Sequence, residues 1–220
     1  MAAIERTAYP RLKKNLTRRE LREVYTITTE ENQFAHSVAR GPIPILSFLI
    51  MMKCFQRLGY FPRPKDIPAS VISHIRTCLH LPNDTEPNFQ TKALYRHQKA
   101  IREYLKVTPF GKMPLDIAAT AIYKAAQVMN NPADLINVAI AELIKERCEL
   151  PAFSTLDRLT RRVRTVVNYQ FFNKVLTRLS VKEKSKLDQL LDTSKQLQKS
   201  DYNYLKDLPK SQIYKPDYRG

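Results

Sequence analysis

Apolar residues recur along most of the chain with the 3.6-residue period of an α-helix, and the apolar–polar alternation typical of strands is almost absent. Two helix-start patterns are clear. Thr17 stands three residues before Glu20, and Thr28 stands three residues before Glu31, which is the spacing of a capping box. Only four glycines interrupt the chain. The sequence therefore predicts an all-α protein.

The start and stop signals divide the chain into expected helices. These cover residues 17–25, 29–39, 45–58, 69–81, 91–107, 114–129, 131–148, 154–168 and 180–191. Gly41 is expected to end the second helix in a left-handed conformation, and Gly59 the third. Asn131, with Pro132 next to it, opens the seventh helix. The third helix, ILSFLIMMKCFQRL, is apolar on nearly every side, which predicts the centre of a bundle.

A polar segment with two prolines, LPNDTEPNFQ, has no periodic apolar pattern and predicts a domain boundary. The predicted organisation is a first helical unit, residues 1–81; a linker, residues 82–90; a second helical unit, residues 91–180; and an extra helix with a polar, Tyr-rich tail, residues 181–220.

The helix expected near residues 154–168 has one apolar and one basic face. The apolar face is formed by Leu156, Leu159, Val163, Val166 and Val167. Ser154, with Asp157 three residues later, is the expected start signal. Only residues 149–153 separate this helix from the one before it. A short connection followed by a helix with a basic exposed face is typical of a helix-turn-helix motif.

The charge balance favours a polyanionic partner. The chain has 37 Lys and Arg against 21 Asp and Glu, which gives a net charge of +16 and a pI near 9.8. Nucleic acid is the commonest polyanion for such a protein, and a membrane surface is the alternative. The longest apolar run, residues 43–52, falls far short of the ~20 residues that span a bilayer. No secretion or lipidation pattern is present at the N-terminus, so a bacterial cytoplasmic location is expected.

Candidate DNA contacts follow from the helix-turn-helix hypothesis, in which the start of the second helix meets base edges and flanking cations hold phosphates. The expected base contacts are Ser154, Thr155, Arg158 and Arg161, and the expected supporting contacts are Arg162, Arg164, Thr165, Lys174 and Arg178. A second basic stripe consists of Lys92, Arg96 and Lys99, and the first unit adds Arg63, Lys65 and Arg76. The alternative for each group is a solvated face without a ligand.

Catalytic and metal-binding patterns are absent from the sequence. Cys54, Cys78 and Cys148 stand singly, and the four histidines are scattered, so neither a disulfide framework nor a metal site is expected. No Gly-rich phosphate loop, GxSxG or HExxH occurs, and no cofactor is expected. The tail tyrosines, Tyr202, Tyr204, Tyr214 and Tyr218, lack the Arg and His neighbours that a tyrosine nucleophile needs. The sequence predicts a chain that is not itself an enzyme.

Four segments resemble the N-terminal region of Tn-three-family replicative transposases. They are NLTRRELREVYTITTEE, KCFQRLGYFPRPKDIP, YRHQKAIREYL and ELPAFSTLDRLTRRVR, in that order. The resemblance implies tandem helical DNA-binding domains, similar to centromere-protein-B-like helix-turn-helix units, that bind the terminal inverted repeats of the transposon. In that family an Asp, Asp, Glu metal site lies in a ribonuclease-H-like domain far downstream, and its ligands have no positions in this chain.

Three functions remain to be distinguished. The expected one is binding of double-stranded DNA at transposon ends by the N-terminal part of a transposase. The full-length transposase could act as a dimer. The alternative is a helical protein-interaction or assembly module of the same transposase, with incidental positive charge. The third, a stand-alone nuclease, would require clustered carboxylates and a metal.

Overall fold

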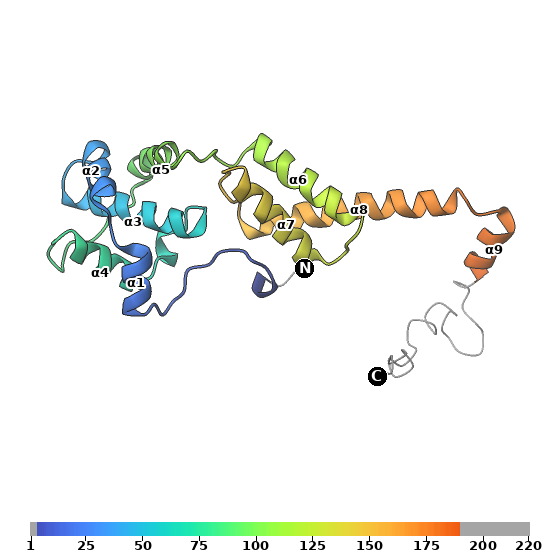
Figure 1. Ribbon diagram of the computed structural model, residues 1–220, viewed down its shortest axis with the longest axis horizontal. Helices are drawn as coiled ribbons and strands as arrows, with labels where there is room; N and C mark the ends of the chain where they lie inside the picture. The colour runs from blue at the N-terminus through green and yellow to red at the C-terminus, as the bar shows by residue number, and fades with distance from the viewer. Residues whose placement is uncertain (1–3, 190–220) are drawn as a thin grey trace, which may run out of the picture. The chain divides into compact units, whose positions relative to one another are not determined.

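The computed structural model describes residues 4–189, and over that range the protein is built from helices (Figure 1). Two short 3-10 turns, Ile4–Arg6 and Pro64–Asp66, accompany the α-helices. The described residues contain no strand, only an isolated bridge between Thr108 and Cys148. The predicted all-α class is confirmed. By contact density, the chain divides into two compact units, Met1–Val167 and Asn168–Gly220.

The first two helices begin where their capping boxes predict. Helix α1 is Arg18–Tyr25 and helix α2 is Thr29–Val38. The Thr17 hydroxyl accepts the Glu20 backbone N–H at 3.2 Å, and the Glu20 carboxylate accepts the Thr17 N–H at 2.9 Å. The same reciprocal pair joins Thr28 and Glu31. Local sequence therefore fixes both starts.

Helix α3, Pro42–Leu58, is the centre of the first core, as its apolar sequence predicts. Its residues from Ile45 to Phe55 are all buried. Gly59 ends the helix in the left-handed region with φ 71°, and its N–H donates to Phe55 O at 2.7 Å, which confirms its predicted role. The prediction for Gly41 was wrong: with φ 91° and ψ 160° it precedes α3, while α2 ends at Val38 with Ala39 extended.

The segment expected to be a linker is held on the first core. Helix α4 is Ala69–Cys78, shorter than predicted, and its Arg76 donates to Asn83 O at 2.7 Å. The Asn88 N–H donates to the Ser47 hydroxyl of α3 at 2.8 Å. Arg76 also donates to the Glu86 carboxylate at 2.8 Å, so three hydrogen bonds hold residues 82–90 on α3 and α4.

Helix α5, Thr91–Leu105, follows this segment and packs on α3, with Ile101 fully buried in the first core. Its predicted membership of the second helical unit was wrong, because the tethered segment before it returns the chain to α3. The division of the protein into two helical bodies stays a prediction, with α5 moved to the first.

The second core is built by two helices lying side by side, α6 (Lys112–Ala126) and α7 (Pro132–Lys145), and by the start of α8 (Phe153–Leu176) (Figure 1). The Asn131 side chain accepts the Ala133 N–H at 3.0 Å, which confirms the predicted start of α7. Helix α7 ends before residue 148, and Arg147 is left-handed at φ 50°. The chain turns there toward α8.

The C-terminal compact unit contains the end of α8 and a short helix, α9 (Val181–Gln189). Ser180 and Glu183 form a capping box, with the Ser180 N–H donating to the Glu183 carboxylate at 2.8 Å. This confirms the predicted start of the last helix. Residues 190–220, with the tail tyrosines, lie outside the described range.

Candidate nucleic-acid interface

The connection between α7 and α8, residues 146–152, is pinned by backbone hydrogen bonds. The Thr108 N–H donates to Arg147 O at 2.9 Å, and the Glu149 N–H donates back to Thr108 O at 2.9 Å. The Leu150 N–H donates to Gly59 O at 2.8 Å. The connection is longer than the predicted link of residues 149–153, but three backbone bonds fix where α8 begins.

A partly buried ion pair supports the same connection. Arg102 of α5 donates to the Glu149 carboxylate through Nε at 2.8 Å and through Nη2 at 3.3 Å. The carboxylate also accepts the Phe110 N–H at 3.4 Å, and the Arg102 guanidinium lies 4.8 Å from the centre of the Phe61 ring. This pair was not predicted, because its members are 47 residues apart and neither stands in a local motif.

The N-terminal segment also holds the start of α8. The Tyr9 hydroxyl donates to Pro151 O at 2.8 Å, and its ring stacks on Tyr60 at 5.3 Å between centroids. Phe153 packs edge-on against Tyr9 at 5.7 Å. Burial raises the pKa of Tyr9 far above its ordinary value, so the phenol remains a neutral donor.

Helix α8 starts one residue earlier than predicted. It begins at Phe153, and Ala152 O accepts the Thr155 N–H at 2.8 Å, so Ser154 lies in the first turn and is not the N-cap. Ser154 is exposed and Thr155 is half-buried. Ala152, the residue before the helix, has no side chain that could cap it.

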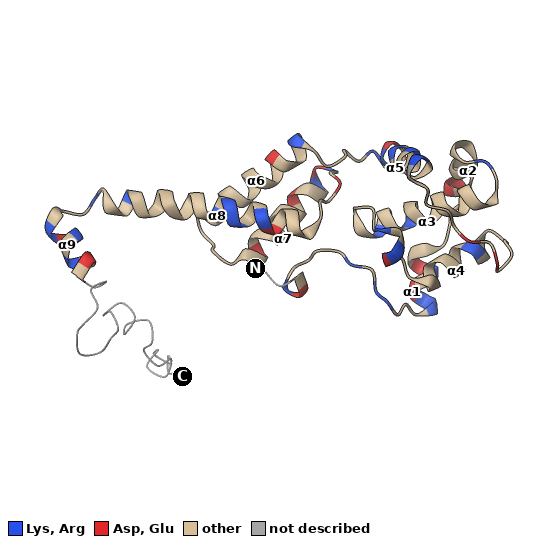
Figure 2. Ribbon diagram, turned by 180° about the vertical axis from the view of Figure 1, so that it is seen from behind, with Lys and Arg blue, Asp and Glu red and all other residues tan. Residues whose placement is uncertain are grey.

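The predicted base-contacting arginines lie on the exposed face of α8, where basic residues gather in its first half (Figure 2). Arg158 is exposed. Arg161 is 49% exposed, and its Nη2 donates to Asp157 Oδ2 at 2.8 Å. Asp157 is buried. Arg161 is thus exposed but partly engaged in the fold.

The flanking residues of α8 have different surroundings. Arg164 Nε donates to Asn130 Oδ1 at 2.9 Å, and the Thr165 hydroxyl donates to Arg161 O at 3.0 Å. Arg162 is exposed and borders a hollow of about 360 Å³ that Tyr123 and Val166 also line. Val166 is 49% exposed, so its predicted place in the buried stripe was wrong, whereas Leu156 and Val167 are buried as predicted.

Two predicted phosphate contacts, Lys174 and Arg178, fall in the C-terminal compact unit. Both side chains are exposed. They are available to a polyanion.

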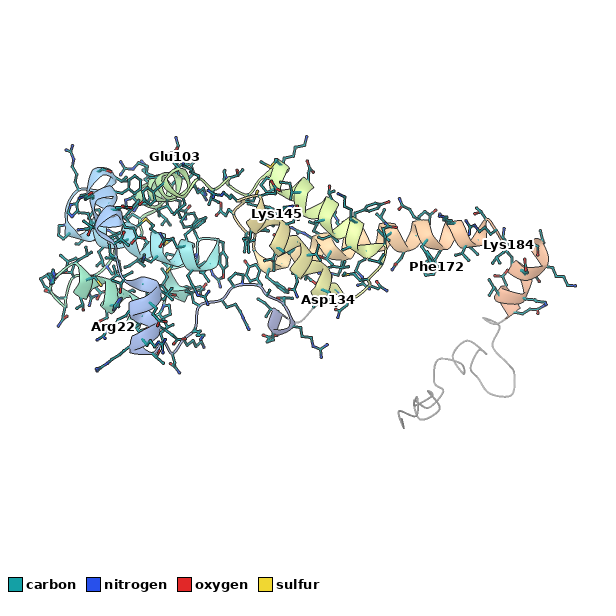
Figure 3. The ribbon with its side chains drawn as sticks, viewed as in Figure 1. Arg22, Glu103, Asp134, Lys145, Phe172 and Lys184 are labelled. Carbon is teal, nitrogen blue, oxygen red and sulfur yellow. The ribbon has the colours of Figure 1, made fainter. Side chains whose placement is uncertain are left out.

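The stripe on α5 faces solvent as predicted. Lys92, Arg96 and Lys99 are exposed, and Lys99 lies 3.9 Å from Glu103, which projects outward (Figure 3). On the opposite face His97 is 5% exposed and packs edge-on against Phe48. Burial, with the nearby charge of Arg96, lowers the pKa of His97, so this side is apolar and neutral.

Of the three candidates from the first unit, two are exposed and one is not. Arg63 is exposed and pairs with Asp66 at 2.8 Å, and Lys65 is exposed beside it. The prediction for Arg76 was wrong: its side chain is 11% exposed, and it donates to Asn83 O and to the Glu86 carboxylate. Arg76 is a structural residue of the 82–90 segment.

Candidates that are far apart in sequence meet in one cleft. Arg63, Lys65 and Ser154 all line a cavity of about 1250 Å³ at the junction of the two cores, together with Tyr9 and Leu150. The cleft thus joins the start of α8 to residues of the first core. We call it the junction cleft.

The described residues carry no group of three or more His, Cys, Asp or Glu side chains placed to hold a metal ion. Within residues 4–189, no helix is long and apolar enough to span a bilayer. Burial raises the pKa of the Cys54 thiol to about 12, so at neutral pH it is a protonated core side chain.

Comparison with known proteins gives a family without a named function. No curated protein matches the sequence. A family model described as "Domain of unknown function (DUF4158)" matches residues 1–163, which is most of the chain and includes both cores and the first half of α8. The chain therefore belongs to the DUF4158 family.

Proposed function

We propose that this chain binds double-stranded DNA sequence-specifically at the terminal inverted repeats of a transposon, as the N-terminal part of a replicative transposase. In this proposal the chain positions the DNA and performs no strand chemistry itself. Cutting and joining belong to a separate catalytic domain.

One observation carries the proposal: exposed arginines occupy the first half of a helix whose start is rigidly held. Three backbone hydrogen bonds and the Tyr9 contact fix the entry to α8, and Arg158 and Arg161 project from its next turns. A helix that reads bases must be held in a defined orientation, since its contacts require alignment with the base edges.

The family and the charge support the same proposal. DUF4158 domains occur at the N-terminus of Tn-three-family transposases, which act on the DNA ends of their transposons. The net charge of +16 adds a sequence-independent attraction to phosphates. We further propose that the two cores act as tandem helix-turn-helix units, with α7 and α8 forming the second.

An assembly module is the second candidate, and a specific observation favours it. The end of α8 exposes a row of large apolar side chains, namely Tyr169, Phe171, Phe172, Val175 and Leu176. Phe172 projects away from the helix (Figure 3). Exposed apolar groups of this size are common at protein interfaces. This function would use the C-terminal compact unit and could coexist with DNA binding.

Equilibrium binding to duplexes tests the proposal. The chain is titrated with a terminal-repeat duplex and with a scrambled duplex of equal length, over a salt series. We expect tighter binding to the terminal repeat and a steep fall in affinity with salt, because several phosphates release counterions. Equal weak binding to both duplexes, with self-association that depends on Phe172, would favour the assembly module instead.

A further inference from the structure

The junction cleft is strongly basic. Its lining includes five basic side chains, Arg11, Lys14, Arg63, Lys65 and Arg102, against two acidic ones, Asp66 and Glu149. Both acids are already neutralised, because Asp66 pairs with Arg63 and Glu149 pairs with Arg102, each at 2.8 Å. The cleft therefore has an excess of positive charge.

Two lysines account for the uncompensated part of that charge. Arg11 has its own partner, Glu5, at 3.3 Å. Lys14 and Lys65 form no ion pair among the described residues, and both are exposed. Like charges gathered in one cleft repel each other, and an anion between them would relieve that repulsion.

Hydrogen-bond donors also converge on the cleft. Ser70 lies in the first turn of α4, lines the cleft, and has a buried hydroxyl without a hydrogen-bond partner among residues 4–189. The starts of α4 and α8 both line the cleft, and the residues before them, Pro68 and Ala152, offer no capping side chain. The starts of α3, α5 and α6 also lack a side-chain cap, so it is the position of the α4 and α8 starts at the cleft that sets them apart.

We propose that the junction cleft is the seat of one backbone phosphate of the bound DNA, held by Lys14, Lys65 and the Ser70 hydroxyl. This inference rests on the proposed function and names the group that the cleft takes. Lysines act as point charges on phosphate, and N–H groups at a helix start add partial positive charge toward it.

The position of the phosphate site in the junction cleft explains its role in DNA binding. Ser154 lines the same cleft, and Arg158 follows it by one turn along α8. A phosphate held beside the start of α8 would set the register of the duplex against the arginines that follow. Phosphate contacts of this kind position a protein on DNA without reading sequence.

The test compares cleft variants with matched controls in the full chain. The Lys14→Ala/Lys65→Ala double variant removes two charges from the cleft, and Lys13→Ala/Lys124→Ala removes two exposed charges that do not line it. Ser70→Ala removes the cleft hydroxyl without changing charge, and Ser73→Ala removes an exposed hydroxyl from the same helix. Circular dichroism and thermal unfolding establish that each variant folds.

We expect the cleft double variant to bind both terminal-repeat and scrambled duplexes about tenfold more weakly than the wild type. Its log–log salt slope should fall by roughly one, the value for one neutralised phosphate. Ser70→Ala should weaken binding several-fold with an unchanged slope, while both controls stay near the wild type. The inference is overturned if the wild type binds DNA and the cleft variants lose no more than their controls. Failure of the wild type to bind any duplex would instead refute the proposed function.

A second arm separates the possible sources of the phosphate. Inorganic phosphate alone is titrated into the wild type and the cleft double variant by calorimetry. A DNA phosphate seat gains affinity from the rest of the duplex, so millimolar or weaker binding of inorganic phosphate is expected. Micromolar binding that the double variant abolishes would overturn the assignment to DNA and identify a site for free phosphate.

Discussion

Arg158 and Arg161 stand less than one turn apart on α8, yet only Arg161 also pairs with a buried acid. Because Asp157 is 4% exposed, loss of the Arg161 guanidinium removes a charged hydrogen bond from a buried carboxylate. Arg158→Ala should leave the free energy of unfolding unchanged within about 0.5 kcal/mol. Arg161→Ala should lower it by about 1–3 kcal/mol. Urea unfolding measures both values.

The same two variants test base contact. Each should weaken binding to the terminal repeat by ~1–3 kcal/mol and barely change binding to scrambled DNA. Arg164→Ala and Lys174→Ala should weaken both duplexes alike, because a phosphate contact carries no sequence information. Equal losses on both duplexes for Arg158→Ala would show that α8 holds the backbone and does not read bases.

Glu31 shows how one residue serves two purposes. Its carboxylate completes the capping box of α2 and also accepts from Lys53 Nζ at 3.0 Å and from Gln56 Nε2 at 2.8 Å. Burial alone would raise the pKa of Glu31, but the Thr28 N–H, Gln56 and Lys53 outweigh it and hold the pKa below its ordinary value of 4.5. Folding therefore favours the ionised carboxylate.

This lowered pKa predicts an acid-dependent loss of stability. The contribution of Glu31 is fully present above the unfolded pKa of 4.5 and is lost as the pH falls through the folded value below it. We expect the free energy of unfolding to fall with acid below pH 4.5, and Glu31→Gln to make that fall shallower. Urea unfolding between pH 3 and pH 7, on the order of ten points, measures the slope. An unchanged slope in Glu31→Gln would contradict the prediction.

At the scale of elements, Gly59 ends α3 in a conformation that other residues rarely adopt. Its φ is 71°, and an added Cβ would lie 3.4 Å from the Leu150 side chain. Gly59→Ala should therefore lower the free energy of unfolding by about 1–2 kcal/mol. Gly111 is the matched control, since its φ of −167° suits any residue and an added Cβ would meet only Pro109 O at 4.0 Å. A loss for Gly111→Ala as large as that for Gly59→Ala would contradict this account.

The helix starts could be predicted from sequence because their causes are local. Thr17, Thr28, Asn131 and Ser180 each bond a backbone N–H within three residues, so short patterns contain the whole interaction. The partner of α5 could not be predicted, because the tether between Asn88 and Ser47 joins residues 41 apart. The prediction for Gly41 was wrong because a glycine between two helices can serve the end of one or the start of the next.

Some residues of the candidate site could also be predicted from the sequence, and others could not. Exposure of Arg158, Lys92, Arg96 and Lys99 follows from helical periodicity and was predicted. The junction cleft could not be predicted from the sequence, because Lys14, Ser70 and Ser154 come together only when both cores and the N-terminal segment are in place. Arg76 shows the opposite case: its basic side chain on a short helix predicts a surface contact, but it is buried and bonded to a carbonyl and a carboxylate of the next segment.

For the whole molecule, two basic faces belong to two different cores. The α5 stripe, Lys92, Arg96 and Lys99, is carried by the first core, and the arginines at the start of α8 are carried by the second. If the cores are tandem DNA-binding units, each face should meet its own part of the terminal repeat. A footprint of the full chain on the repeat should then contain two separable regions of protection.

Paired variants separate these regions. Lys92→Ala/Arg96→Ala/Lys99→Ala should remove protection from one part of the repeat, and Arg158→Ala/Arg162→Ala should remove it from the other, because each set of charges acts on the phosphates and bases nearest to it. Hydroxyl-radical footprinting compares the two variants at a protein concentration at which each of them saturates the DNA. A uniform loss over the whole repeat in both variants would mean that the two faces share one contact region. Loss only in the α8 variant would leave the α5 stripe as a solvated face and make the second core the sole DNA-binding unit.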